Sequence, residues 1–244
     1  MFQFTFQLQP EWSLLTRDEI LDEYYAKYFT ALCNSGAQGW GSRKFHKNIE
    51  GNWKNGNPRR ILEVGAGTGE HFAYLQSINP EVIQEYIALD IRAKVNSKAA
   101  NLPEGLVPVK WVSASVQDIP LADSYFDGAI SSCLLHHLED PYLALLELRR
   151  IVANNGEISI GMPTDPGIAN QMLKKLYTYR KARKIGIENP KFIYSLEHRN
   201  HLIGLLSILQ EVFKNDKIVL SYWPFKLANW HLNLSVNVNI IVSK

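Results

Sequence analysis

The feature of this sequence with the clearest chemistry is a glycine-rich segment that follows a short apolar run. Ile61-Leu-Glu-Val64 precedes glycines at positions 65, 67 and 69, and a helical pattern starts at Glu70. Glycine lets the backbone approach a ligand closely and adopt positive φ, and a helix N-terminus behind the loop offers free N–H groups to polar ligand atoms. The spacing differs from the dinucleotide fingerprint. Glu63, directly before the loop, favours a ligand with a cationic amino group over a pyrophosphate.

Five short apolar runs predict the sheet that must position this loop. The predicted strands are residues 61–64, 86–91, 107–112, 126–131 and 157–162. Between the last two, Leu145, Leu148 and Val152 recur at helical spacing, and residues 154–156 end that helix. Strands that alternate with helices indicate a doubly wound α/β sheet. Ligands of such sheets bind outside the carboxyl ends of the strands.

The last third of the chain breaks this alternation. Residues 168–184 and 196–213 predict helices, and residues 217–222 and 235–242 predict strands. The segment between these two strands has no helical pattern and is too short for a helical crossover. We therefore expect an antiparallel pair at the end of the chain.

Composition and charge exclude several classes of protein. With 244 residues, 46% hydrophobic and 20% charged, the chain can build a full core without disulfides. A net charge of +2 gives no global reason to expect nucleic acid as a partner, and no apolar run predicts a transmembrane helix. Cys33 and Cys133 are expected to be free thiols. Since the N-terminus lacks the pattern of a signal peptide, we expect a cytoplasmic protein.

The strand-loop-helix pattern resembles the class I S-adenosylmethionine-dependent methyltransferases of the small-molecule type. The resemblance covers roughly residues 60–163 and rests on motifs that recur in order. It implies a Rossmann-like, seven-stranded methyltransferase sheet with an antiparallel last strand, and S-adenosyl-L-methionine as the cofactor. We expect an N-terminal helical cap over residues 1–57 and a methyltransferase domain over residues 58–244. Within that domain we expect a donor-binding core (58–163), then acceptor-side helices and a final hairpin (164–244).

The resemblance also implies donor-binding roles. Asp90 closes the second predicted strand and matches the acid that binds both ribose hydroxyls. Residues 114–120 resemble the adenine-side loop, and residues 131–140 resemble the segment along the methionine end. Where the family usually carries an acid for the adenine amine, this chain has Ser115, a weaker acceptor, and Asp118 is a nearby substitute. The implied donor-binding residues are Glu63, Gly65, Ala66, Gly67, Gly69, Asp90, Ser115, Val116, Asp118 and Ser132.

An alcohol that accepts a methyl group needs a base, and histidine suits this role at neutral pH. His136 and His137 follow the fourth predicted strand, so one of them should face the methyl group. Certain sugar O-methyltransferases look similar, with an acid after the fifth strand, which here is Asp165. We expect His137 or His136 as the base and Asp165 as the group that orients it. The alternative, equally weighted, is one histidine that caps a helix and one packed in the core. No metal site is predicted.

The flanking segments supply candidates for binding the acceptor: His46, His198, Arg199 and Tyr24. The alternative for the histidines is a solvated surface, and for Tyr24 plain core packing. Residues 168–201 carry eight basic and two acidic side chains. That excess fits either a solvated helix face or an anionic acceptor, such as a nucleotide-linked or lipid-diphosphate-linked sugar, or a membrane surface.

The function predicted from these features is O-methylation of a sugar or glycan precursor. Residues 45–50 and 197–200 carry a weaker likeness to methyltransferases of surface-polysaccharide gene clusters. The alternatives are N- or C-methylation of another small metabolite and a donor-binding protein without catalysis. Nucleic acid is disfavoured as acceptor because the base-methylating motifs are not seen. The oligomeric state is left open.

Overall fold

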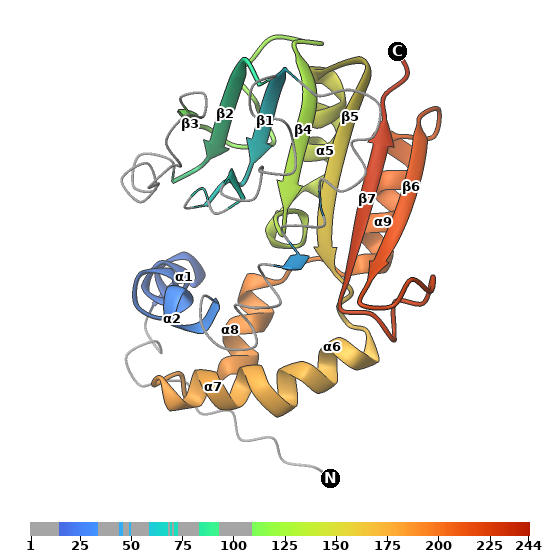
Figure 1. Ribbon diagram of the computed structural model, residues 1–244. Helices are drawn as coiled ribbons and strands as arrows, with labels where there is room; N and C mark the ends of the chain where they lie inside the picture. Colours follow the sequence, from blue (N-terminus) through green and yellow to red (C-terminus); the bar gives the residue numbers. More distant parts are fainter. Residues whose placement is uncertain are drawn as a thin grey trace.

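The computed structural model describes residues 15–33, 44–45, 49, 59–67, 69, 71–72, 83–92 and 109–244. Within them lies a seven-stranded sheet with the order β3-β2-β1-β4-β5-β7-β6 (Figure 1). Strands β1 to β5 pair in parallel, and β7 runs antiparallel to both β5 and β6. The strands are β1 (Arg60–Val64), β2 (Glu85–Asp90), β3 (Val109–Ser113), β4 (Phe126–Ser132), β5 (Val152–Pro163), β6 (Lys217–Trp223) and β7 (Ser235–Ile241). The predicted fold class and the antiparallel end of the sheet are confirmed.

Hydrophobic side chains cover both faces of this sheet. On one face, helix α5 (Pro141–Ile151) contributes Leu145 and Leu148, and helix α9 (Leu202–Val212) contributes Leu205. Phe45, Phe72 and Ile49 pack together on the other face of the sheet. Burial of these faces explains why the central strands are nearly continuous apolar runs, as is typical of parallel sheets.

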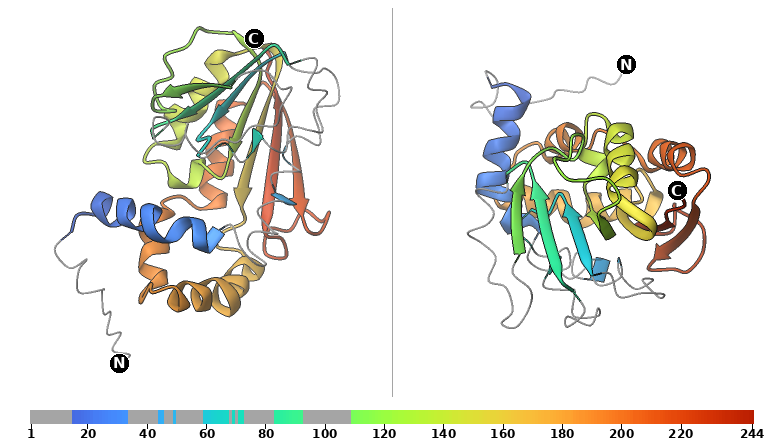
Figure 2. Two further views of the ribbon diagram at one scale, coloured as in Figure 1. Left: turned by 60° about the vertical axis from the view of Figure 1, so that its left-hand side comes forward. Right: turned by 90° about the horizontal axis from the view of Figure 1, so that it is seen from above.

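The remaining described helices gather at the carboxyl ends of the parallel strands (Figure 1). They are α1 (Arg17–Tyr24), the π-helical turn η2 (Tyr25–Phe29), α2 (Thr30–Cys33), α6 (Ile168–Leu173), the π-helical turn η6 (Lys174–Thr178), α7 (Tyr179–Lys184) and α8 (Pro190–Glu197). In the left view of Figure 2, α1 and α2 lie beside α6 to α8 below the sheet. Ile20, Leu21 and Tyr24 pack there against Ala182 and Ile193.

This packing makes the cap a composite of two distant parts of the chain. The described part of the predicted 1–57 segment shares one hydrophobic cluster with α7 and α8. A capping box starts α1, because the side chain of Thr16 accepts from the backbone of Glu19 and the Glu19 carboxylate accepts from Thr16. The cap therefore stands over the edge of the sheet at which ligands of this architecture bind.

Most strand boundaries lie within two residues of the sequence predictions, and two regions differ by more. Helix α5 ends at Ile151, and β5 begins at Val152 rather than at residue 157, because Val152 already pairs with Phe126 across a bulge. The single helix predicted over residues 196–213 is wrong: α8 ends at Glu197 and α9 begins at Leu202. The intervening turn donates the backbone N–H groups of Arg199 and Asn200 to the carbonyl of His136. That turn brings His198 toward the end of β4.

Candidate active site

The glycine loop after β1 has the backbone that the sequence predicts. Gly65, Gly67 and Gly69 all have positive φ, at 66°, 54° and 81°. The N–H groups of Gly65 and Ala66 donate to the carbonyl of Leu89 at the end of β2, at 2.8 and 3.2 Å. A Cβ on Gly65 would lie 2.8 Å from the side chain of Leu134. The loop is thus fixed between the ends of β1, β2 and the segment after β4, in a conformation that favours glycine.

Asp90 joins this loop to the end of β2. Its Oδ2 accepts from the backbone N–H of Gly67 at 2.9 Å, and its Oδ1 accepts from that of Arg92 at 2.8 Å. The side chain is half-buried. Each carboxylate oxygen has a further lone pair. Asp90 therefore lies where the prediction requires it, with capacity to bind hydroxyl groups at the sheet edge.

Glu63 is buried on the face of the sheet that also carries Tyr86 of β2 and against which Phe72 packs. Its side chain is 2% exposed, and Oε2 accepts from the hydroxyl of Tyr86 at 2.6 Å. The Tyr86 hydroxyl fixes the orientation of the carboxylate just before the loop. The predicted contact of Glu63 with a cationic amino group stays a prediction.

The predicted adenine-side segment forms a tight turn after β3. The hydroxyl of Ser115 accepts from the N–H of Gln117 at 3.1 Å, and the carbonyl of Ser115 accepts from the N–H of Asp118 at 3.2 Å. Val116 is buried in the main core, whereas the side chain of Asp118 is exposed. Of the two candidate acceptors for an adenine amine, the Ser115 hydroxyl already accepts one hydrogen bond, and the Asp118 side chain is exposed to solvent. Ser132 closes β4 and is half-buried.

Three histidine rings meet beyond β4. His136 and His137 belong to the short 3₁₀ turn η5 (Leu135–His137), and His198 comes from the turn between α8 and α9. The ring centroids are 4.0 Å apart for His136 and His137, 4.4 Å for His136 and His198, and 4.9 Å for His137 and His198. We call these three residues the histidine cluster. The sequence pointed to each of them separately, and the structure brings them together.

Two imidazoles of the cluster, those of His136 and His198, have pKa values that their surroundings lower. Burial lowers the pKa of His136 well below its usual value, and the neighbouring rings and Lys174 act in the same direction. Burial likewise lowers the pKa of His198, again with His137 and Lys174 contributing. The Nδ1 of His137 lies 2.9 Å from the carbonyl of Glu197, which can only accept, so Nδ1–H donates and Nε2 is the ring nitrogen left for other contacts.

Asp165 has a different role from the predicted one. Its carboxylate forms an ion pair with Lys174, in which both side chains are 5% exposed, and Oδ1 also accepts from the amide of Gln171 at 2.8 Å. No hydrogen bond to a histidine ring is found among the described residues. Glu197 holds His137 in position through its backbone carbonyl, and Asp165 positions Lys174.

Lys174, Tyr194 and Glu197 are site residues that sequence reasoning missed. The ammonium of Lys174 lies 3.9 Å from the ring centroid of Tyr194, and that ring stacks on His198 at 3.8 Å. The buried Glu197 carboxylate accepts from the hydroxyl of Tyr25 at 2.9 Å, which ties η2 to the site. Lys174 shares a helix face with Asn170, four residues earlier, but the burial of that face is visible only in the structure.

The other predicted acceptor residues fall in different places. Tyr24 is 3% exposed in the hydrophobic cluster of the cap, so the core-packing alternative holds for it. Arg199 is exposed and pairs with Glu139 at 3.2 Å. His46 lies outside the described residues.

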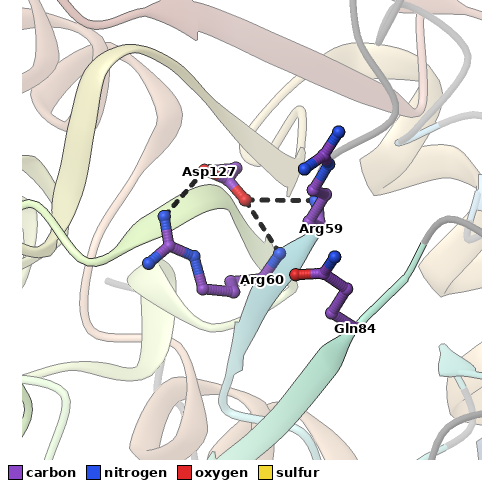
Figure 3. A pocket seen from close by; sticks show the side chains of 4 residues that line it. All are labelled: Arg59, Arg60, Gln84 and Asp127. Atoms are coloured by element: carbon purple, nitrogen blue, oxygen red, sulfur yellow. Dashed lines mark hydrogen bonds and ion pairs between the residues drawn. The ribbon is translucent and has the colours of Figure 1, made fainter.

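A pocket of about 440 Å³ lies at the opposite, amino-terminal edge of the sheet. Figure 3 shows its lining, in which Asp127 bridges the backbone and guanidinium of Arg60 and the backbone of Arg59, with Gln84 beside them. None of the predicted site residues lines it. This pocket is therefore separate from the candidate active site.

Within the described part of the chain, no helix is both long and apolar enough to cross a bilayer.

The region of the chain that carries the glycine loop and Asp90 is similar to known proteins. A family model described as a methyltransferase domain matches residues 62–160. An uncharacterized methyltransferase of Mycobacterium tuberculosis is 28% identical over 110 residues, which are 45% of this chain and 53% of that protein. The chain spans about half the length of the curated relatives that it matches first.

Solved structures share the fold over most of the chain. A methyltransferase of Thermotoga maritima superposes with a TM-score of 0.58 at 16% identity, covering 92% of this chain and 96% of that one. The N-methyltransferase NodS of Bradyrhizobium japonicum, solved with S-adenosyl-l-homocysteine, superposes with a TM-score of 0.58 at 13% identity, covering 93% and 99%. At these identities the likeness shows the fold.

Proposed function

We infer that this chain, whose residues 62–160 match the methyltransferase-domain model, transfers a methyl group from S-adenosylmethionine to a small-molecule acceptor. The observation that carries the inference is the glycine loop tied to Asp90 within that domain. The loop holds its glycines in a left-handed conformation that lets a ligand approach the backbone closely, and the Asp90 carboxylate can accept from a ribose. NodS, which shares the fold, was solved with the demethylated donor.

The residues at hand fit this cofactor. The loop, Asp90 and Ser115 would hold the nucleoside, and Glu63 and Ser132 lie toward the segment expected at the methionine end. When bound, the cofactor supplies an electrophilic methyl group on a positively charged sulfur. The protein then has to align the acceptor and exclude water, and such positioning can lower the barrier by ~7–11 kcal/mol.

We further propose that the acceptor group is a hydroxyl and that it faces the histidine cluster. The cluster follows β4, at the carboxyl edge of the sheet where the donor is expected. An imidazole nitrogen of the cluster would take the proton of that hydroxyl, with His137 or His136 as the proton acceptor. A placed base of this kind adds ~10²–10⁴-fold to the rate.

A sugar or glycan precursor is the acceptor class we propose. The cap beside the cluster carries exposed basic side chains, which suit a phosphate-linked sugar: Lys175, Arg180, Arg183, Lys184 and Lys191. Lys174, which the sequence places among them, is instead buried against Asp165 and does not contribute to this surface. An amine acceptor is the second candidate, since NodS is an N-methyltransferase of the same fold.

The test is methyl transfer from a labelled donor to a panel of nucleotide-linked and lipid-diphosphate-linked sugars and of amines. With the hydroxyl acceptor identified, His137→Ala should lower kcat by ~10²–10⁴-fold while donor affinity stays near that of the wild type. His201→Ala is the matched control, because His201 is exposed and lies outside the cluster. Transfer to amines alone, or near-wild-type kcat in both His136→Ala and His137→Ala, would remove the hydroxyl proposal.

A further inference from the structure

We propose that His136, His137 and His198 form a binding site for a divalent zinc ion. One ring nitrogen from each residue lies within 4.8 Å of the others. Two of the ligands come from one turn after β4, and the third comes from the turn between α8 and α9. Two separate segments thus place three imidazoles at one point.

The distances are close to what the ion needs. In a tetrahedral site with Zn–N bonds of ~2.0–2.1 Å, ligand nitrogens are ~3.3 Å apart. The rings would therefore have to close by ~1.5 Å at most, and rotations about the side-chain bonds can supply this without moving the sheet. His136 and His137 are neighbours in sequence, with centroids already 4.0 Å apart.

The nitrogens of the cluster are free to act as ligands. The Nδ1 atoms of His136 and His198 are buried and have no hydrogen-bond partner in the described structure. A buried polar atom without a partner is costly, so such atoms call for an explanation. His137 has its Nδ1–H engaged by the Glu197 carbonyl, which leaves Nε2 for an ion. Contacts of this kind orient histidine ligands at metal sites.

The groups around the cluster are compatible with a bound cation. A carboxyl oxygen of Glu197 lies 4.0 Å from Nε2 of His198, so an oxygen atom that can accept lies beside the cluster. Lys174 is the nearby cation, and Asp165 neutralises it. Imidazoles suit zinc and its neighbours in the transition series, whereas magnesium and calcium prefer oxygen ligands.

Three histidines leave one tetrahedral position open, as catalytic zinc sites do. This consequence rests on the proposed function: the acceptor hydroxyl would take the open position. The ion would then lower the pKa of that hydroxyl in place of an imidazole base. The hydroxyl proton would leave to solvent as the O–C bond forms and the S–C bond breaks.

The experiment titrates zinc alone into tag-free, chelator-treated protein and measures heat of binding, with visible absorption of cobalt as a second readout. One ion should bind per chain. His198→Ala and His137→Ala should each weaken binding by ~100-fold or more, since even loss of an orienting contact costs 10–100-fold. His201→Ala, three residues from His198 and exposed, should bind like the wild type.

The zinc site is overturned if the wild-type protein binds no zinc. It is also overturned if the folded variants His198→Ala, His137→Ala and His201→Ala bind zinc with equal affinity. Circular dichroism establishes that the variants are folded. Binding of S-adenosylmethionine is measured on the same samples. Donor binding without zinc binding refutes the zinc site alone, and zinc binding without donor binding refutes the proposed function alone.

Discussion

Lys174 lies in a run of basic residues that suggests a solvated helix face, yet its side chain is among the most buried charges of the chain. Its only charged partner among the described residues is Asp165, and burial lowers its pKa against the effect of that partner. Removing one member of a buried ion pair leaves an uncompensated charge, which costs ~3–5 kcal/mol.

We therefore expect Lys174→Met to lower the free energy of unfolding by ~3–5 kcal/mol, measured by urea denaturation. The double variant Lys174→Met, Asp165→Leu should recover much of the loss, because two apolar side chains replace the pair. A single variant as stable as the wild type would show that the pair is not a buried, coupled unit.

At the same scale, the sequence predicts the backbone of the glycine loop and the position of Asp90 better than the arrangement of the histidines. The glycines and Asp90 act through backbone conformation and strand position, and both follow from local pattern. The contact between His198 and His136 depends on how the turn after α8 folds back, which no periodicity encodes. The same reason explains why Asp165 was assigned to a histidine rather than to Lys174.

At the scale of elements, buried parallel strands were the easiest to predict, because each is a short apolar run closed by turn residues. The helix predicted over residues 196–213 joins the end of α8 to α9, because neither glycine nor proline marks the break at residues 198–201. The break is set by tertiary contacts: the amide of Asn200 donates to the carbonyls of Leu135 and Leu138.

Strand β5 carries a carboxyl group that makes stability depend on pH. Burial raises the pKa of Glu157 from 4.5 to about 7, partly offset by a hydrogen bond from Asn239. Between pH 4.5 and about pH 7, Glu157 holds a proton in the folded chain that it has released in the unfolded chain. The associated stability is fully present below pH 4.5 and is lost as pH rises through about 7.

Glu157→Gln should therefore unfold at a higher temperature than the wild type at pH 8, with the difference vanishing near pH 4.5. The measurement is thermal denaturation of both proteins across this range. Glu188→Gln, at an exposed position, serves as the control and should track the wild type. A constant difference between Glu157→Gln and wild type at all pH values would contradict a raised pKa at Glu157.

At the scale of the whole molecule, the acceptor side carries an exposed apolar stripe. Ile168, Met172 and Leu176 are 59%, 55% and 57% exposed along α6 and η6. The connection between β6 and β7 adds Phe225 and Leu227, and it lies against α6 through a hydrogen bond from Ala169 to His231. Neither residues 168–184 nor residues 223–234 contain an acid. Such a surface suits peripheral contact with an anionic membrane.

We propose that this surface contacts an anionic membrane, and we predict co-sedimentation with phosphatidylglycerol vesicles that is weakened by salt and is much less with phosphatidylcholine vesicles. Met172→Glu with Leu176→Glu should abolish it. Ile203→Glu, an equally exposed site on α9, should leave it intact. Equal binding by the double variant and the Ile203→Glu control would rule out the stripe as the contact surface.

The account as a whole depends on donor binding at the glycine loop and Asp90, and calorimetry with S-adenosylmethionine and its demethylated product tests it most directly. Arginine at position 67 would strain a residue with a φ of 54° and fill the loop, and no described atom lies within 4 Å of its Cβ, so the fold should persist. We predict one site in the wild type and in Glu188→Ala, with affinity at least ~10-fold weaker in Gly67→Arg and Asp90→Ala. Wild-type protein that binds neither compound, or a folded Gly67→Arg variant with wild-type affinity, would contradict the donor site.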